Sequence, residues 1–174
     1  AVKKEKMMPA LKWVLYSLLL LSCYVLQTTP GLFEIFGKKP VLAAALAVCV
    51  SMYEGVLSSA FFSMMAGLLW DISSNRLFGF NGLILLCCGV LISLLCIYYL
   101  HTRWLNSLLF CTLAMLVQGL LDYLFYYAIW GYPGVSLILV QNILPTLLYT
   151  AAVTPLLFLL VRRIHRKFSV VERA

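Results

Sequence analysis

The sequence predicts an all-α fold, a polytopic bundle of six transmembrane helices that forms one domain over residues 1–174. The first observation is composition, because 64% of the residues are hydrophobic, the mean hydropathy is +1.00 and only 11% are charged. A soluble domain is about half apolar and about one quarter charged. The second observation is that apolar runs fill nearly the whole chain between two basic ends. This composition excludes a soluble enzyme, a secreted domain and a disordered chain.

The first half of the chain is expected to contain three helices. The first runs over about residues 11–29 and stops at a Pro-Gly pair. The next apolar stretch, 40–70, would measure about 46 Å as one helix, whereas a bilayer core is about 30 Å thick. It also contains Glu54, whose charge would be costly at bilayer depth. We therefore expect helices at 40–52 and 56–70 with a turn at Glu54, the shorter helix being tilted, re-entrant or sheltered by its neighbours.

The second half of the chain is expected to contain three longer helices. They cover about residues 80–100, 104–130 and 135–161, and the second of them stops at a Gly-Tyr-Pro-Gly turn. Pro145 and Pro155 lie inside the last helix, where neighbouring helices can satisfy the carbonyl groups that proline leaves free. A basic tail follows at 162–174.

The positive charges predict how the bundle is oriented. With six helices, ten of the 13 Lys and Arg residues lie on one side, together with both termini, and three lie on the other. The positive-inside rule then places both termini in the cytoplasm. Because these charges flank membrane spans and accompany no groove-reading or base-stacking element, we expect contact with anionic membrane lipid and no nucleic acid.

Polar residues collect in the half of the bundle that faces away from the termini. Gln118 and Asp122 share one helix face, and Asn142 lies at a similar depth on the next helix. Asp71 is expected to end its helix and to hold the following loop by helix capping and a pair with Arg76. Three interpretations stay open: helix capping and helix-to-helix bonding, docking of a partner's membrane segment, or an outward-facing pocket for a small molecule.

No arrangement of residues that would support catalysis accompanies these polar groups. The two carboxylates have no nucleophile, metal-ligand neighbour or phosphate-binding loop beside them, so we expect no enzyme activity, no metal and no cofactor. The cysteines all lie inside apolar runs, which indicates small buried hydrophobic residues (Cys23, Cys49, Cys87, Cys88, Cys96 and Cys111).

Small residues form a stripe along the third helix. They recur every four residues, as Gly55, Ser59, Ser63 and Gly67. Such a stripe lets helices approach closely, either inside the bundle or against another protein's helix. Gly79, just before Asn81, is expected to allow a tight entry into the fourth helix.

Two motifs resemble a known family. Gly67-Leu68-Leu69-Trp70-Asp71 and the following Gly79-Phe80-Asn81-Gly82-Leu83 resemble the Gly-Leu-Leu-x-Asp … Leu-Gly-x-x-x-Leu signature of MreD, the bacterial rod shape-determining membrane protein family. The last helix, from Leu144-Pro145 through Pro155-Leu156 to Arg162-Arg163, is similar to the family's Pro-x-x-Leu-Tyr-Asn … Pro-Leu … Arg-Arg ending, with Thr150 where Asn is often found. The resemblance covers residues 40–167.

The resemblance implies a non-enzymatic scaffold of the cell-wall elongation complex (elongasome) in the bacterial cytoplasmic membrane. Such a protein binds MreC, a single-pass protein, alongside the MreB filament, a RodA-type glycosyltransferase and a class B penicillin-binding transpeptidase. It supports peptidoglycan synthesis and cell shape. The family is similar in fold to the substrate-binding S components of energy-coupling-factor vitamin transporters, which supplies the alternative function. Against that alternative, residues 11–27 lack the Ala-x-x-x-Ala docking motif of S components.

Overall fold

The computed structural model describes residues 2–29, 31, 39–74, 77–99, 102–128, 141 and 143–169. Its elements are α1 (Val2–Thr28), α2 (Leu42–Ser51), α3 (Val56–Ser74), α4 (Phe80–Tyr98), α5 (Trp104–Tyr123), the π-helical turn η1 (Leu124–Ala128) and α7 (Leu144–Ser169). Five of these described helices are long and apolar enough to cross a membrane. The chain is therefore an all-α, multi-pass membrane protein, as its composition predicts.

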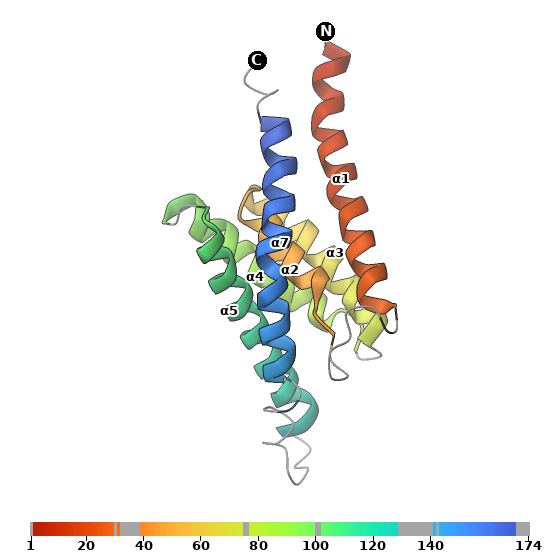
Figure 1. Ribbon diagram of the computed structural model, residues 1–174, viewed down its shortest axis with the longest axis vertical. Helices are drawn as coiled ribbons and strands as arrows, with labels where there is room; N and C mark the ends of the chain where they lie inside the picture. Colours follow the sequence, from red (N-terminus) through yellow and green to blue (C-terminus); the bar gives the residue numbers. More distant parts are fainter. Residues whose placement is uncertain are drawn as a thin grey trace.

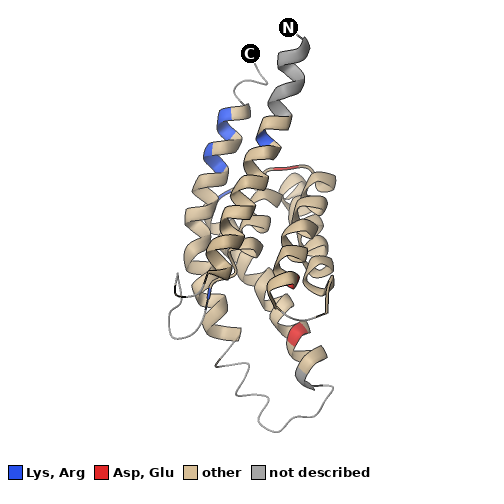
Figure 2. Ribbon diagram, turned by 90° about the vertical axis from the view of Figure 1, so that its right-hand side faces the viewer, with Lys and Arg blue, Asp and Glu red and all other residues tan. Residues whose placement is uncertain are grey.

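The start of α1 and the end of α7 lie at the same end of the bundle (Figure 1). We call this the terminal end, and the opposite one the far end. In Figure 2 most of the Lys and Arg residues drawn in blue gather at the terminal end, on α7 and α1.

The helix α2 lies in the middle of the bundle. Each of its ten residues is buried, and it packs against α1, α3, α4, α5 and α7. At 1.5 Å per residue it is about 15 Å long, half the thickness of a bilayer core. Of the three possibilities for this short helix, the structure therefore supports shelter by its neighbours. The chain turns at residues 52–55 and enters α3 at Val56, which confirms the expected turn at Glu54.

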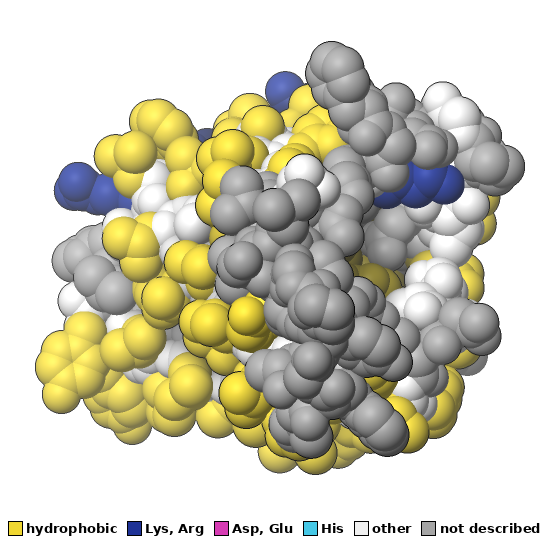
Figure 3. Space-filling view, turned by 90° about the horizontal axis from the view of Figure 1, so that it is seen from below, with side chains coloured by type: hydrophobic (Ala, Val, Ile, Leu, Met, Phe, Trp, Pro, Cys, Tyr) yellow, Lys and Arg dark blue, Asp and Glu magenta, His cyan; other side chains and the backbone are white. Residues whose placement is uncertain are grey.

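Large apolar side chains cover the outside of the bundle. Leu57, Phe61, Leu83 and Leu91 are each more than half exposed. Exposing such a surface to water would cost free energy, whereas exposing it to lipid acyl chains would not. This surface therefore contacts lipid. In the view from the far end, apolar side chains make up most of the left and lower parts of the described surface (Figure 3).

Three helix boundaries differ from the sequence-based prediction. The first helix begins at Val2 rather than near residue 11, α3 continues past Asp71 to Ser74, and α7 continues to Ser169 through much of the predicted tail. For α1 and α7 the physical reason is that hydropathy marks membrane depth, while the backbone stays helical where good helix formers such as Lys, Arg and Met adjoin the apolar segment. The predicted stretches at 129–130 and 135–140 lie outside the described residues.

Candidate functional site: a polar cluster at the far end

Asp71, near the end of α3, caps the first turn of α4. Its carboxylate accepts hydrogen bonds from the backbone N–H groups of Gly79 (2.9 Å), Asn81 (3.1 Å) and Gly82 (3.2 Å). Asp71 is only 2% exposed. A helix begins with backbone N–H groups that have no partner in the helix, and its dipole favours negative charge there. The capping predicted for Asp71 is confirmed, although the residue lies inside its own helix rather than ending it.

Glycines bring α3 and α4 together beside this cap. A Cβ atom added to Gly67 would lie 2.5 Å from Gly82 Cα and 2.6 Å from the Asn81 carbonyl oxygen, which no real structure tolerates. Gly79 precedes α4 with a φ of +95°, a conformation that glycine adopts at little cost. The tight entry predicted for this glycine is therefore confirmed.

A side-chain hydrogen bond extends the cluster to α5. The Gln118 side-chain amide donates to Asn81 Oδ1 at 3.0 Å, and both residues are buried. Asp122, one turn further along α5, is 8% exposed and lines a cavity together with Asn81 and Gln118. The structure thus brings together four of the polar residues predicted to converge, from three different helices.

A cavity of about 270 Å³ lies among α3, α4, α5 and α7. Its lining combines two amides, a carboxylate, hydroxyl groups and apolar side chains (Trp70, Ser74, Asn81, Met115, Gln118, Gly119, Asp122, Ile143 and Thr146). Its size is near the lower limit of the roughly 300–1,000 Å³ that small-molecule sites occupy. The arrangement can supply hydrogen-bond donors and acceptors around one carboxylate.

A second hollow, of about 470 Å³, lies over the start of α2. It shares Trp70 and Ser74 with the first cavity. Here the backbone N–H of Ala43 donates to the Gln27 side chain (3.2 Å), and that of Val41 donates to the Thr150 hydroxyl (3.0 Å). Because α2 spans only half of the bundle, its first turn needs these caps and leaves space above it.

The small-residue stripe of α3 is already covered inside the bundle. Ser59 and Ser63 are fully buried, and the Ser63 hydroxyl lies 3.1 Å from that of Ser51 on α2. A Cβ on Gly89 of α4 would collide with Ser63. This corrects the alternative in which the stripe receives another protein's helix. Gly55 has nothing within 4 Å of an added Cβ and plays no part in this packing.

Three further predicted site residues have different outcomes. Pro145 lies in the first turn of α7, where its missing N–H costs no helical hydrogen bond. Arg76, with its expected pair to Asp71, and Asn142 lie outside the described residues.

Among the cysteines, Cys23, Cys49 and Cys111 are buried as expected, whereas Cys87 is exposed on the apolar surface.

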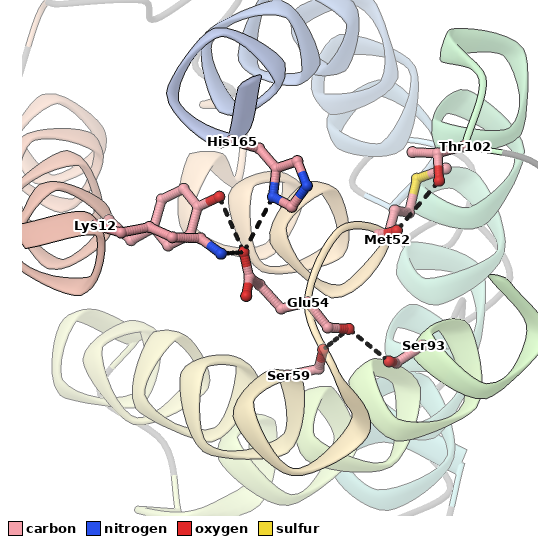
Figure 4. Close-up of polar contacts among 8 residues, drawn as sticks. Lys12, Met52, Glu54, Ser59, Ser93, Thr102 and His165 are labelled. Carbon is pink, nitrogen blue, oxygen red and sulfur yellow. Dashed lines mark hydrogen bonds and ion pairs between the residues drawn. The ribbon is translucent and has the colours of Figure 1, made fainter. Parts of the chain in front are cut away.

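A second polar centre surrounds Glu54 at the terminal end (Figure 4). The Lys12 ammonium lies 2.6 Å from Glu54 Oε1, the Tyr16 hydroxyl donates to the same oxygen at 3.2 Å, and His165 Nδ1 lies 3.4 Å from it. The Glu54 backbone carbonyl accepts hydrogen bonds from Ser59 and Ser93. One residue in the turn therefore connects α1, α3, α4 and α7.

An aromatic side chain borders this centre. Tyr53 packs against His165, with ring centroids 5.0 Å apart. Burial raises the pKa of the Tyr53 hydroxyl to about 12, and the nearby Arg162 acts in the opposite direction.

The residues of the Glu54 centre were not among the site residues predicted from the sequence. Depth was the available signal, because Lys12 lies near the start of the predicted first helix, Glu54 lies in the turn expected on the same side, and His165 lies just after the predicted last helix. That signal gives a level in the membrane but no direction around each helix. Contact between α1 and α7, the first and last helices, is a property of the packed bundle.

The fold and these two centres define a class, a multi-pass helical membrane protein with a buried polar cluster at the far end and a partly buried one at the terminal end. Comparison with known proteins adds no family to this description, since no family model, curated protein or solved structure matches the chain.

Proposed function

We propose that this chain is a non-enzymatic membrane scaffold of the bacterial cell-wall elongation complex, with both termini in the cytoplasm. It would bind an MreC-like single-pass protein and thereby help to maintain cell shape. The observation that carries this proposal is that the residues resembling the MreD signature form one structural unit. Gly67, Asp71, Gly79, Asn81 and Gly82 all belong to the capped, closely packed junction of α3 and α4.

The partner's membrane anchor needs a surface outside the α3 stripe, because that stripe is covered. An apolar groove of about 370 Å³ between α4 and α5 offers one. Its floor includes the buried Ile92 and Ala114, and its rim includes the exposed Leu91 and Leu113. An apolar helix would fill this groove by van der Waals packing, which drives helix association in membranes.

Co-purification tests this assignment. The tagged chain would be expressed with the MreC-like protein of the same genome and extracted in mild detergent. Tryptophan at Leu91 or at Val117 fills the groove from its rim, so each variant should reduce recovery of the partner at least tenfold. The matched control is Leu57→Trp, an exposed position on α3, which should leave recovery unchanged.

Each result bears on a different part of the proposal. Full recovery with both groove variants would place the partner elsewhere. Failure of the unmodified chain to capture the partner, in cells where both are present in the membrane, would overturn the scaffold itself.

A second candidate function is that of a vitamin-binding S component, and the cavity beside Asn81 and Gln118 favours it. Native mass spectrometry and thermal unfolding with thiamine, riboflavin and biotin separate the two functions. Tight binding raises stability by about 2.7 kcal/mol at a ligand concentration 100 times Kd. Such a shift, lost in Gln118→Leu, would favour the S component over the scaffold.

A further inference from the structure

The apolar groove between α4 and α5 has the length of one leaflet of a membrane. Its described lining runs from Leu83 to Leu95 on α4, which is about 18 Å at 1.5 Å per residue. A bilayer core is about 30 Å thick, so each leaflet contributes about 15 Å. Because α4 begins at the far end, the groove covers the leaflet on that side. Its dimensions match a single acyl chain of that leaflet.

The surface of the groove is apolar throughout its described lining. The floor includes Ile84 and Phe110, which are buried, and the rim includes Leu91 and Leu113, which are more than half exposed. Such a surface gains van der Waals contacts with an alkyl chain and offers no hydrogen bond to a polar group. The groove therefore suits the chain of a lipid and excludes its head.

A polar cavity adjoins the groove near the far end. On α5, Ala114 and Val117 line the groove, while Gln118 and Gly119 on the neighbouring face line the cavity. On α4, Asn81 of the cavity precedes the groove by one helical turn. A molecule whose chain lies in the groove thus brings its head to the level of the two amide side chains. Polarity changes from apolar to hydrogen-bonding within one turn.

The two amides favour an uncharged head that carries hydroxyl groups. Within the described part of the chain, the side chains of Asn81 and Gln118 make one hydrogen bond, to each other, at 3.0 Å. Gln118 Oε1 can still accept a hydrogen bond, and Asn81 Nδ2 can still donate one. A hydroxyl group does both. The described lining of the cavity contains no Lys or Arg, the side chains that bind phosphate.

We propose that the groove and the cavity together form a binding site for a single-chain lipid with an uncharged, hydroxylated head, such as a monoacylglycerol. The acyl chain fills the groove, and the head hydroxyls bond to Asn81 and Gln118. Lipid binding does not depend on the scaffold function. The lipid and a partner's membrane anchor would exclude each other from the groove, and this consequence alone rests on the proposed scaffold function.

Native mass spectrometry of the full chain, without a partner, tests the site. The detergent is an amine oxide, whose head carries no hydroxyl group that could compete. The probes are 1-monooleoylglycerol and methyl oleate, which have the same acyl chain but differ in the two hydroxyl groups. Monooleoylglycerol should bind at least about tenfold more tightly, because two further hydrogen bonds of ordinary strength contribute that much.

Two variants separate the chain from the head. Val117→Trp fills the groove beside the amides and should abolish binding of both probes. Gln118→Leu should lower the affinity for monooleoylglycerol to that for methyl oleate. Val117 is 40% exposed, so its replacement tests the site even if Gln118→Leu folds poorly. The matched controls are Leu57→Trp on the exposed surface of α3 and Thr112→Val, whose hydroxyl bonds within α5, and both should leave the affinities unchanged.

The opposite outcomes would overturn the proposal. Equal affinities of the unmodified chain for the two probes would reduce the contact to ordinary lipid at an apolar surface. Full binding by Val117→Trp would place the lipid elsewhere. Displacement of monooleoylglycerol by glycerol at equal concentration would indicate a site for a small polar molecule. Tighter binding of oleoyl lysophosphatidylglycerol would indicate a phosphate site instead of a hydroxyl site.

Discussion

Gly67 on α3 lies directly against Gly82 on α4, so that a Cβ atom on Gly67 would be 2.5 Å from the Gly82 Cα atom. The contact is backbone against backbone, and no side chain can move aside to relieve a clash. Packing of this kind is the main source of helix association in membranes, where the hydrophobic effect contributes little.

Gly67→Ala should therefore separate α3 from α4. Overpacking of a core costs about 1–3 kcal/mol, and the rigid backbone places this site at the upper end of that range. Thermal unfolding in detergent measures the loss. Gly55→Ala is the matched control, because nothing lies within 4 Å of its added Cβ. Equal melting temperatures for the two variants would contradict the close approach.

Asp71→Asn should loosen the first turn of α4. The amide keeps one acceptor oxygen but turns an NH₂ group toward backbone N–H donors, and hydrogen bonds to charged groups contribute about 1.5–3 kcal/mol. Hydrogen exchange should speed up at Gly79, Asn81 and Gly82 more than elsewhere. Ser73→Ala, which removes a hydroxyl bonded only within α3, serves as the control. Unchanged exchange at the three amides would show that the cap contributes little.

Thr150→Val should destabilise the start of α2. Valine has nearly the same shape but cannot accept the hydrogen bond from the Val41 backbone N–H, and a buried unsatisfied donor costs about 1–3 kcal/mol. Thr150→Ser keeps the hydroxyl and should restore most of the stability. Thr112→Val is the control, because the Thr112 hydroxyl bonds within its own helix. If serine is no better than valine, the effect comes from packing.

Glu54→Gln should weaken the contacts of α1 and α7 with the turn between α2 and α3. Removing one partner of a buried ion pair leaves the other charge uncompensated and costs about 3–5 kcal/mol, and the 17% exposure of Lys12 favours the lower end. A double-mutant cycle with Lys12→Met should give a coupling of about 0.5–3 kcal/mol. Arg103→Gln, an exposed charge at the same end, is expected to show no coupling to Glu54→Gln.

Local chemistry in the sequence was sufficient to predict several parts of the site. The charge of Glu54 inside a long apolar stretch located the turn between α2 and α3. The glycine at position 79 predicted a tight entry into α4, and Asp71 at the matching level predicted a cap. Each of these follows from what one residue costs or permits at a given depth, which requires no knowledge of neighbouring helices.

The rotation of each helix about its own axis, and therefore which side chain faces which neighbouring helix, could not be predicted from the sequence. Ser63 faces Ser51 and Gly89 instead of a partner protein, and His165 faces Glu54 across a sequence separation of 111 residues. In a membrane every helix is apolar on most sides, so the hydropathy pattern that orients helices in water is weak.

The sequence alone determined that this protein is a helical membrane bundle and where its polar residues lie in depth. Composition and spacing suffice for these properties, because lipid imposes the same cost on every exposed polar group. Only the tertiary structure decided that α2 is fully enclosed, that the α3 stripe is covered by α4, and that Glu54 joins the first and last helices. These depend on which helix faces which, and that is decided by packing the whole bundle at once.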